Sequence, residues 1–116
     1  MRQVGILAAA ALHALAHHRG RLADDHANAR TLADRMALAD GVRVDRAAVE
    51  TNIVNLDLDV PAASVSQAAR EAGLLVNPSG PKRLRAVTHL DVSRADVETA
   101  AEILASVVAA NRPSTK

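Results

Sequence analysis

The segment VNLDLDVP, residues 54–61, decides the fold class of this chain. Apolar and polar side chains alternate along it, which is the pattern of a β-strand with one face buried and the other in water. Proline cannot donate a ladder hydrogen bond, so Pro61 ends the strand. The sequence therefore predicts a sheet that is covered on one face only. The residues predicted to face the core are Val54, Leu56, Leu58 and Val60.

Upstream of this strand, residues 1–39 are predicted to be helical almost throughout, with a break at HHRG, residues 17–20. The run at residues 4–16 is nearly all apolar. It is shorter than the roughly 20 residues that span a membrane, and Arg2 is its only basic flank. We expect a buried helix here and keep a secretory signal peptide as the minor alternative.

The second helix is predicted to be amphipathic, because apolar residues recur at three- and four-residue steps. Polar residues, among them Asp24, Asp25 and Asn28, are assigned to the other face. The turn residues Asp40-Gly41 end the helix, and a short strand follows at residues 42–44. The predicted stripe consists of Leu22, His26, Ala29, Ala33 and Met36.

Downstream of the opening strand, Ser64 and Gln67 predict a capping box at the start of a helix that Gly73 ends. Residues 74–76 are predicted to form a short strand. The segment NPSGP, residues 77–81, is predicted to be a loop, because two prolines and a glycine exclude regular structure there.

A further strand is predicted at residues 82–88, with Leu84 and Ala86 on its core face. Ser93 and Asp96 form a second capping box, which begins the last helix. The opposite face of the strand carries Arg83, Arg85 and Val87. The apolar stripe of the helix is Val97, Ala101, Leu104 and Val108.

This order of elements predicts the α+β class. We expect a small, mainly antiparallel sheet of three to four strands with helices packed on one face, preceded by a long N-terminal helical segment. The whole chain, residues 1–116, is predicted to be a single domain. Within it we expect a helical segment at 1–39, an α+β core at 40–112 and a tail at 113–116.

Composition disfavours several function classes. The chain has 14 Lys and Arg against 13 Asp and Glu, so it has no surplus of positive charge to neutralise a run of phosphates. It has no Phe, Tyr or Trp on which bases could stack. We expect neither nucleic acid nor membrane as a partner. The absence of cysteine excludes disulfides and thiolate metal sites.

Histidines and carboxylates offer little chemistry by spacing alone. His13 and His17 stand four apart on a helix and could both face a metal ion, but no third ligand is spaced to join them. We therefore predict no metal site. His26 is predicted to be a half-buried histidine of the helix stripe. The positions of Asp24, Asp25 and Asp91 near helix starts are explained by the helix dipole.

The two arginines of the last strand are the best candidates for ligand binding. Arg83 and Arg85 share a predicted strand face, and a guanidinium offers a planar fork that suits a carboxylate or phosphate. Read alone, such arginines are more often solvated edge residues, and both interpretations stay open.

Four stretches together resemble one family. They are MRQVGILAAAALHAL, RLADDHANARTLA, VETNIV and RAVTHLDVS, and their order and spacing are similar to the C-terminal part of the low-specificity L-threonine aldolases. The resemblance implies the aspartate-aminotransferase type of fold and a dependence on pyridoxal phosphate (PLP). It also implies retro-aldol cleavage of threonine or allo-threonine to glycine and acetaldehyde, a cytoplasmic location and a homo-oligomer.

The same resemblance implies roles for particular residues. Arg85 matches the family's arginine that binds the α-carboxylate of the amino-acid substrate, and Arg2 matches an arginine near the cofactor. Thr51-Asn52 match a family pattern without a role that we can assign. The family's PLP-binding lysine has no match, because the only lysines are Lys82 and Lys116.

We therefore expect this chain alone to bind no PLP and to be inactive. The alternative is a free-standing α+β module without catalytic activity that self-associates through its N-terminal helix.

Overall fold

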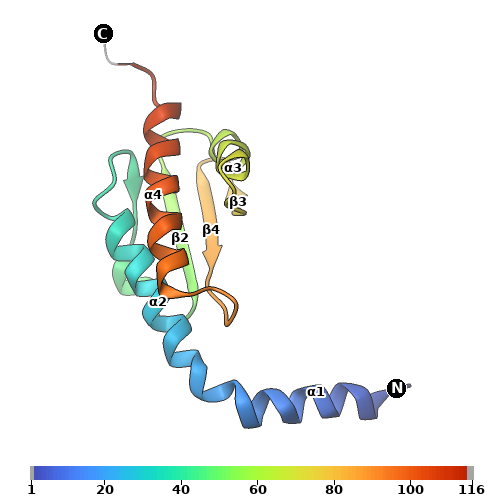
Figure 1. The fold of residues 1–116 in the computed structure, drawn as a ribbon. Coiled ribbons are helices and arrows are strands. Elements are labelled where there is room, and N and C mark those ends of the chain that lie inside the picture. The colour runs from blue at the N-terminus through green and yellow to red at the C-terminus, as the bar shows by residue number, and fades with distance from the viewer. Residues whose placement is uncertain (1, 115–116) are drawn as a thin grey trace.

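The computed structural model describes residues 2–114, which form four α-helices and one sheet of four strands (Figure 1). The helices are α1 Val4–His17, α2 Leu22–Met36, α3 Ala62–Glu71 and α4 Arg94–Asn111. The strands are β1 Val42–Arg43, β2 Ile53–Leu58, β3 Asn77–Gly80 and β4 Arg83–Val87. Short 3₁₀ turns lie at Arg19–Arg21 and Arg46–Ala48. The predicted α+β class is confirmed.

The sheet is antiparallel throughout, in the order β1-β2-β4-β3. The helices α2 and α4 lie side by side over one face of it (Figure 1). On β2 and β4, the residues that point toward these helices are buried, apart from the partly buried Ala86, and their neighbours are partly or fully exposed, as the alternation predicted. The sheet is therefore covered on one side and open on the other.

The core is built from aliphatic side chains that meet between the sheet and the helices. Leu56 and Leu84 are fully buried, and they are Cα partners across β2 and β4. The predicted stripe of α4 is buried, as are Val65 and Ala69 of α3. The predicted capping box of α4 is confirmed, since Ser93 and Asp96 exchange side-chain to backbone hydrogen bonds of 3.1 and 2.9 Å.

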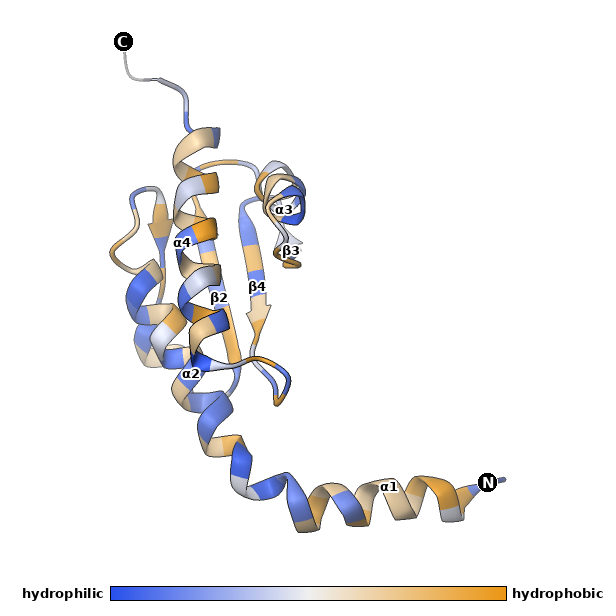
Figure 2. Cartoon of the chain, viewed as in Figure 1, coloured by the Kyte–Doolittle hydropathy of each residue, from blue (hydrophilic) through white to orange (hydrophobic). Residues whose placement is uncertain are grey.

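The N-terminal helix α1 exists as predicted, but the prediction that it is buried is wrong. It projects away from the body of the molecule, and none of its residues is buried (Figure 1). Leu12 and Leu15 are 66% and 64% exposed. Figure 2 shows that apolar residues dominate its length. Its composition favours burial, and no other element of the described chain lies over it.

The prediction of which α2 residues are buried was only partly correct. Ala29, Ala33 and Met36 are buried as expected, but Leu22 is 52% exposed. Asp25 and Asn28, which the sequence assigned to the solvent side, are buried instead. The Asn28 amide donates to the backbone carbonyl of Val92, and the backbone carbonyl of Asp25 accepts from the Thr88 hydroxyl, so this side of α2 faces the segment after β4.

The segment around β3 was predicted wrongly. Residues 74–76 are not a strand, and the predicted loop contains β3. β3 is an edge strand with an irregular register between Pro78 and Gly80, and an edge tolerates a proline because the missing N–H costs no inner ladder bond.

The limits of α3 also differ at one end. The helix begins at Ala62, after Pro61, so Ser64 lies inside its first turn and the predicted capping box is absent. The Gln67 amide donates to the Glu71 carboxylate. At the other end, Gly73 has a φ of +89°, which confirms the predicted glycine cap.

Among residues 2–114, no helix is long and apolar enough to cross a bilayer. Of the predicted tail at 113–116, Thr115 and Lys116 lie outside the described residues.

Replacement of a core leucine tests this packing. Leu104 is 1% exposed, so Leu104→Ala is expected to lower the free energy of unfolding by about 2–5 kcal/mol. Leu38→Ala is the matched control, since Leu38 is 87% exposed and its loss is expected to cost less than about 0.5 kcal/mol. Urea denaturation measures both. Equal costs would contradict the assignment of the core.

Candidate functional site

The uncovered side of the sheet carries the residues that can meet a ligand. We call it the open sheet face. The antiparallel register sets its side chains in rows across the strands, because directly paired residues point to the same side. The first row is Arg43, Asp57 and Arg83, the second is Asn55, Arg85 and Asn77, and the third is Ile53 and Val87.

In the first row, the Arg83 guanidinium is already paired with a carboxylate. Its Nε and a terminal guanidinium nitrogen donate to the two carboxylate oxygens of Asp57, at 2.6 and 3.0 Å. This hydrogen bonding, with the positive charges of Arg83 and Arg43, holds the pKa of Asp57 below its ordinary value. Arg83 is therefore part of an internal ion pair and does not present a free fork.

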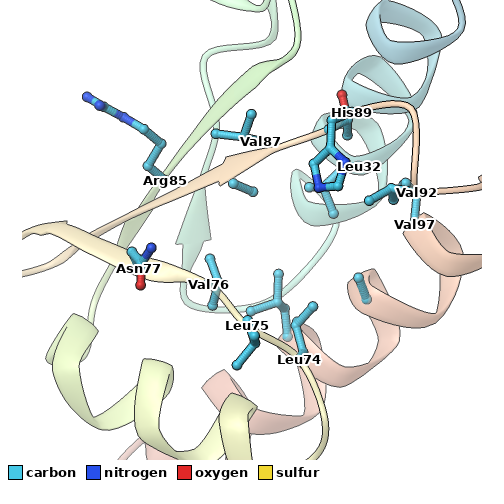
Figure 3. A pocket seen from close by; sticks show the side chains of 14 residues that line it. Leu32, Leu74, Leu75, Val76, Asn77, Arg85, Val87, His89, Val92 and Val97 are labelled. Atoms are coloured by element: carbon cyan, nitrogen blue, oxygen red, sulfur yellow. The ribbon is translucent and has the colours of Figure 1, made fainter.

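In the second row, Arg85 has no such partner. It lies between Asn55 on β2 and Asn77 on β3, all three are exposed, and Arg85 makes no ion pair with any residue between 2 and 114. Figure 3 shows its guanidinium extending away from the apolar side chains nearby. An uncompensated guanidinium on an open surface is suited to binding a carboxylate.

Next to Arg85 the molecule has a cavity of about 280 Å³ (Figure 3). It lies between the end of β4, the segment that leads into β3, and the start of α4. Its walls are mostly aliphatic, with Leu74, Val76 and Val92 among them, and Arg85 lies at its border. Its lining includes the core residues Leu32 of α2 and Val97 of α4, and the Arg85 guanidinium extends away from it (Figure 3).

Polar residues of the sequence motifs form a hydrogen-bond network that holds this region together. The Thr88 hydroxyl donates 2.7 Å to the backbone carbonyl of Asp25, and the Asn52 amide donates 2.7 Å to the carbonyl of Thr88. The Asn28 amide donates 3.2 Å to the carbonyl of Val92. These bonds join α2, the start of β2 and the loop after β4.

The network gives Asn52 the structural role that the sequence did not. Thr88 and Asn28 were missed as well, because their partners lie 36 to 64 residues away along the chain.

The other predicted candidates do not converge on one site. The His13 and His17 rings stack with centroids 4.3 Å apart, and the His17 Nδ1 donates to the His13 carbonyl. Within the described part of the chain, no three ligands are grouped as a metal site would need. His26 is half-buried, as predicted. Asp24 and Asp91 are exposed.

Arg2 and the lysines lie apart from Arg85. Arg2 precedes α1, at the end of that helix remote from the sheet (Figure 1). Lys82 is exposed, and its Nζ donates 2.9 Å to the backbone carbonyl of Asp59 in a surface turn. Lys116 lies outside the described residues. The residues placed by the structure therefore do not fit a covalent PLP site.

Comparison with known proteins finds similarity to one lyase family and to L-threonine aldolases. The model of the beta-eliminating lyase family matches residues 1–59. The chain is 42% identical over 102 residues to the probable low-specificity L-threonine aldolase 2 of Arabidopsis thaliana. It is 41% identical over 108 residues to the low specificity L-threonine aldolase of Escherichia coli (strain K12).

These alignments cover most of this chain and a small part of each relative. They span 84% and 90% of the chain, but 29% of either relative. Among solved structures, the fold is similar to that of MppP, soaked with the product 2-ketoarginine, with a TM-score of 0.62. That match covers 77% of this chain and 29% of MppP at 18% identity, so it shows the fold alone.

The hydrogen-bond network can be tested by removing one hydroxyl. Thr88→Val keeps the shape of a side chain that is 3% exposed but leaves its partner carbonyl short of a donor, so it is expected to lower the free energy of unfolding by about 1–3 kcal/mol. Thr99→Val is the control, because the exposed Thr99 hydroxyl bonds only within its own helix. Chemical denaturation that finds the two variants alike would contradict a role for the network.

Proposed function

Because the chain belongs to the beta-eliminating lyase family, we propose that it is the C-terminal part of a PLP-dependent L-threonine aldolase. The proposed reaction is the retro-aldol cleavage of threonine or allo-threonine to glycine and acetaldehyde. In it, this part of the subunit binds the substrate carboxylate through Arg85. Support comes from the two L-threonine aldolases named above, each of which aligns with most of this chain.

The observation that carries the role of Arg85 is its contrast with Arg83. Both arginines lie on the same face of β4, but the Arg83 fork is filled by Asp57 and the Arg85 fork has no acidic partner among residues 2–114. Of the two, Arg85 is the one able to pair with a ligand.

The chemistry of the site follows from the geometry of the guanidinium. Two parallel N–H groups meeting two carboxylate oxygens fix both the position and the orientation of an amino acid. Such a contact sets which bond at Cα faces the reacting group, and correct orientation supplies a large share of enzymatic rate. PLP, when bound, withdraws electrons from that bond.

The cofactor belongs, in this proposal, to the part of the subunit that this chain does not span. Lys82 has its Nζ on a backbone carbonyl in a surface turn and is not placed to hold PLP. The weaker assignment of Arg2 to the cofactor end of the site stays part of the proposal. So do the inactivity of this chain alone, homo-oligomeric assembly and a cytoplasmic location.

Kinetics of the full-length subunit test the role of Arg85. Arg85→Ala is expected to raise the KM for threonine about tenfold or more, because it removes charge-assisted hydrogen bonds to the carboxylate. Arg83→Ala is the matched control, two residues away on the same face, and its KM is expected to stay close to that of the unchanged enzyme. An unaltered KM in Arg85→Ala would remove the role assigned here.

A second candidate function rests on α1. Every described residue of this helix is exposed, including Ile6, Leu12 and Leu15. Exposed contiguous apolar surface favours association. A free-standing chain would therefore act as a self-associating module without catalytic activity.

Light scattering coupled to size exclusion tests this second function on the 116-residue chain. Self-association through α1 predicts a dimer or larger species, which the double substitution Ile6→Glu with Leu12→Glu shifts to monomer. Leu38→Glu, at an exposed leucine outside α1, is expected to leave the association unchanged. A monomer at all concentrations before any substitution would contradict the idea.

A further inference from the structure

Arg83 and Arg85 stand in nearly matched rows of the open sheet face. The register pairs Asp57 with Arg83 and Asn55 with Arg85. Aspartate and asparagine have almost the same shape, and they differ in that one carboxylate oxygen is replaced by an amide nitrogen. The Asp57–Arg83 and Asn55–Arg85 pairs therefore differ mainly in charge.

We propose that Asn55 and Asn77 are positioning residues that keep the Arg85 guanidinium available to a small carboxylate ligand. This inference rests on the proposed function, in which that ligand is the α-carboxylate of an amino acid. It assigns a role to the neutrality of the two side chains next to Arg85 and not to Arg85 itself.

The neighbouring row shows what a carboxylate at position 55 would do. Asp57 takes two hydrogen bonds from Arg83, at 2.6 and 3.0 Å, and so fills the fork that a ligand would need. Positions 55 and 57 have equivalent cross-strand geometry, because they lie two residues apart on the same strand pair. Opposite charges that face each other across two strands attract.

An amide side chain cannot form such an ion pair. It accepts or donates hydrogen bonds but carries no net charge, whereas the guanidinium stays protonated at all ordinary pH values. The row of Asn55, Arg85 and Asn77 therefore keeps one positive charge. Asn77 occupies the β3 side of Arg85, so both cross-strand neighbours are neutral.

The first test is Asn55→Asp in the full-length subunit, with Asn55→Ala as the neutral control. We expect Asn55→Asp to raise the KM for threonine about tenfold with little change in kcat, because an internal ion pair competes with the substrate carboxylate. Asn55→Ala removes the amide without adding charge and is expected to change the KM much less. Asn55 is exposed, so neither substitution disturbs the core.

A second measurement does not depend on activity. In the 116-residue chain, NMR titration of the carboxyl group introduced by Asn55→Asp is expected to give a pKa below the ordinary value of about 3.9, as Arg83 does for Asp57. Adding Arg85→Ala to the same chain is expected to return that pKa to the ordinary range. A carboxyl at position 55 with an unshifted pKa would overturn the inference.

The two proposals fail in distinguishable ways. If Arg85→Ala raises the KM and Asn55→Asp does not, the inference is overturned while the proposed function stands. If Arg85→Ala leaves the KM unchanged, the substrate-binding role of Arg85 in the proposed function falls and the inference falls with it.

Discussion

The antiparallel pairing of β2 with β4 is the contact on which the rest of the structure depends. Its register places Leu56 opposite Leu84 beneath α2 and α4, where both are fully buried. Since side chains alternate along a strand, the same register turns Asn55 and Arg85 to the open side. The burial of the aliphatic core and the display of a free arginine are thus two consequences of one pairing. A slip of one residue would exchange the two faces.

Side-chain hydrogen bonds also fix how the elements are arranged relative to one another. Thr88, Asn52 and Asn28 use their side chains to join α2, the start of β2 and the loop that leads to α4. Hydrophobic burial alone does not fix the angle at which a helix enters a sheet, whereas hydrogen bonds to particular carbonyls do. The loop that follows Arg85 is therefore held in place by groups distant in the sequence, which steadies the end of the strand that carries the arginine.

The sequence predicted what local patterns determine and missed what distant contacts determine. Alternation identified β2 and β4, and the stripe and capping box identified α4, because each pattern is complete within a few residues. The edge strand β3 was missed since Pro78 is permitted only by its place at the edge of the sheet. The exposure of α1 could not be foreseen either. An apolar sequence indicates that a helix tends to be buried, but it does not indicate which element would bury it.

The candidate site, too, was predicted where a local pattern sufficed and missed where a distant contact decided. Alternation predicted that Arg83 and Arg85 share a face, but only the long-range register showed that one of them meets Asp57 and the other meets Asn55. The resemblance to threonine aldolases implied a role for Arg85 and not for Arg83, and the structure shows that Arg83 pairs with Asp57 while Arg85 has no acidic partner among residues 2–114. The role of Arg85 in binding stays a prediction until a ligand is tested.

The central claim is that this chain works as one part of a larger PLP-dependent subunit. The mass of the native polypeptide in its source cells, by immunoblot against this segment and then intact mass spectrometry, tests it most directly. A product several times larger than 12.1 kDa is expected, since the chain spans 29% of the threonine aldolases it resembles. A native product of 12.1 kDa would contradict it, and would leave the exposed helix α1 as the feature whose partner must be found.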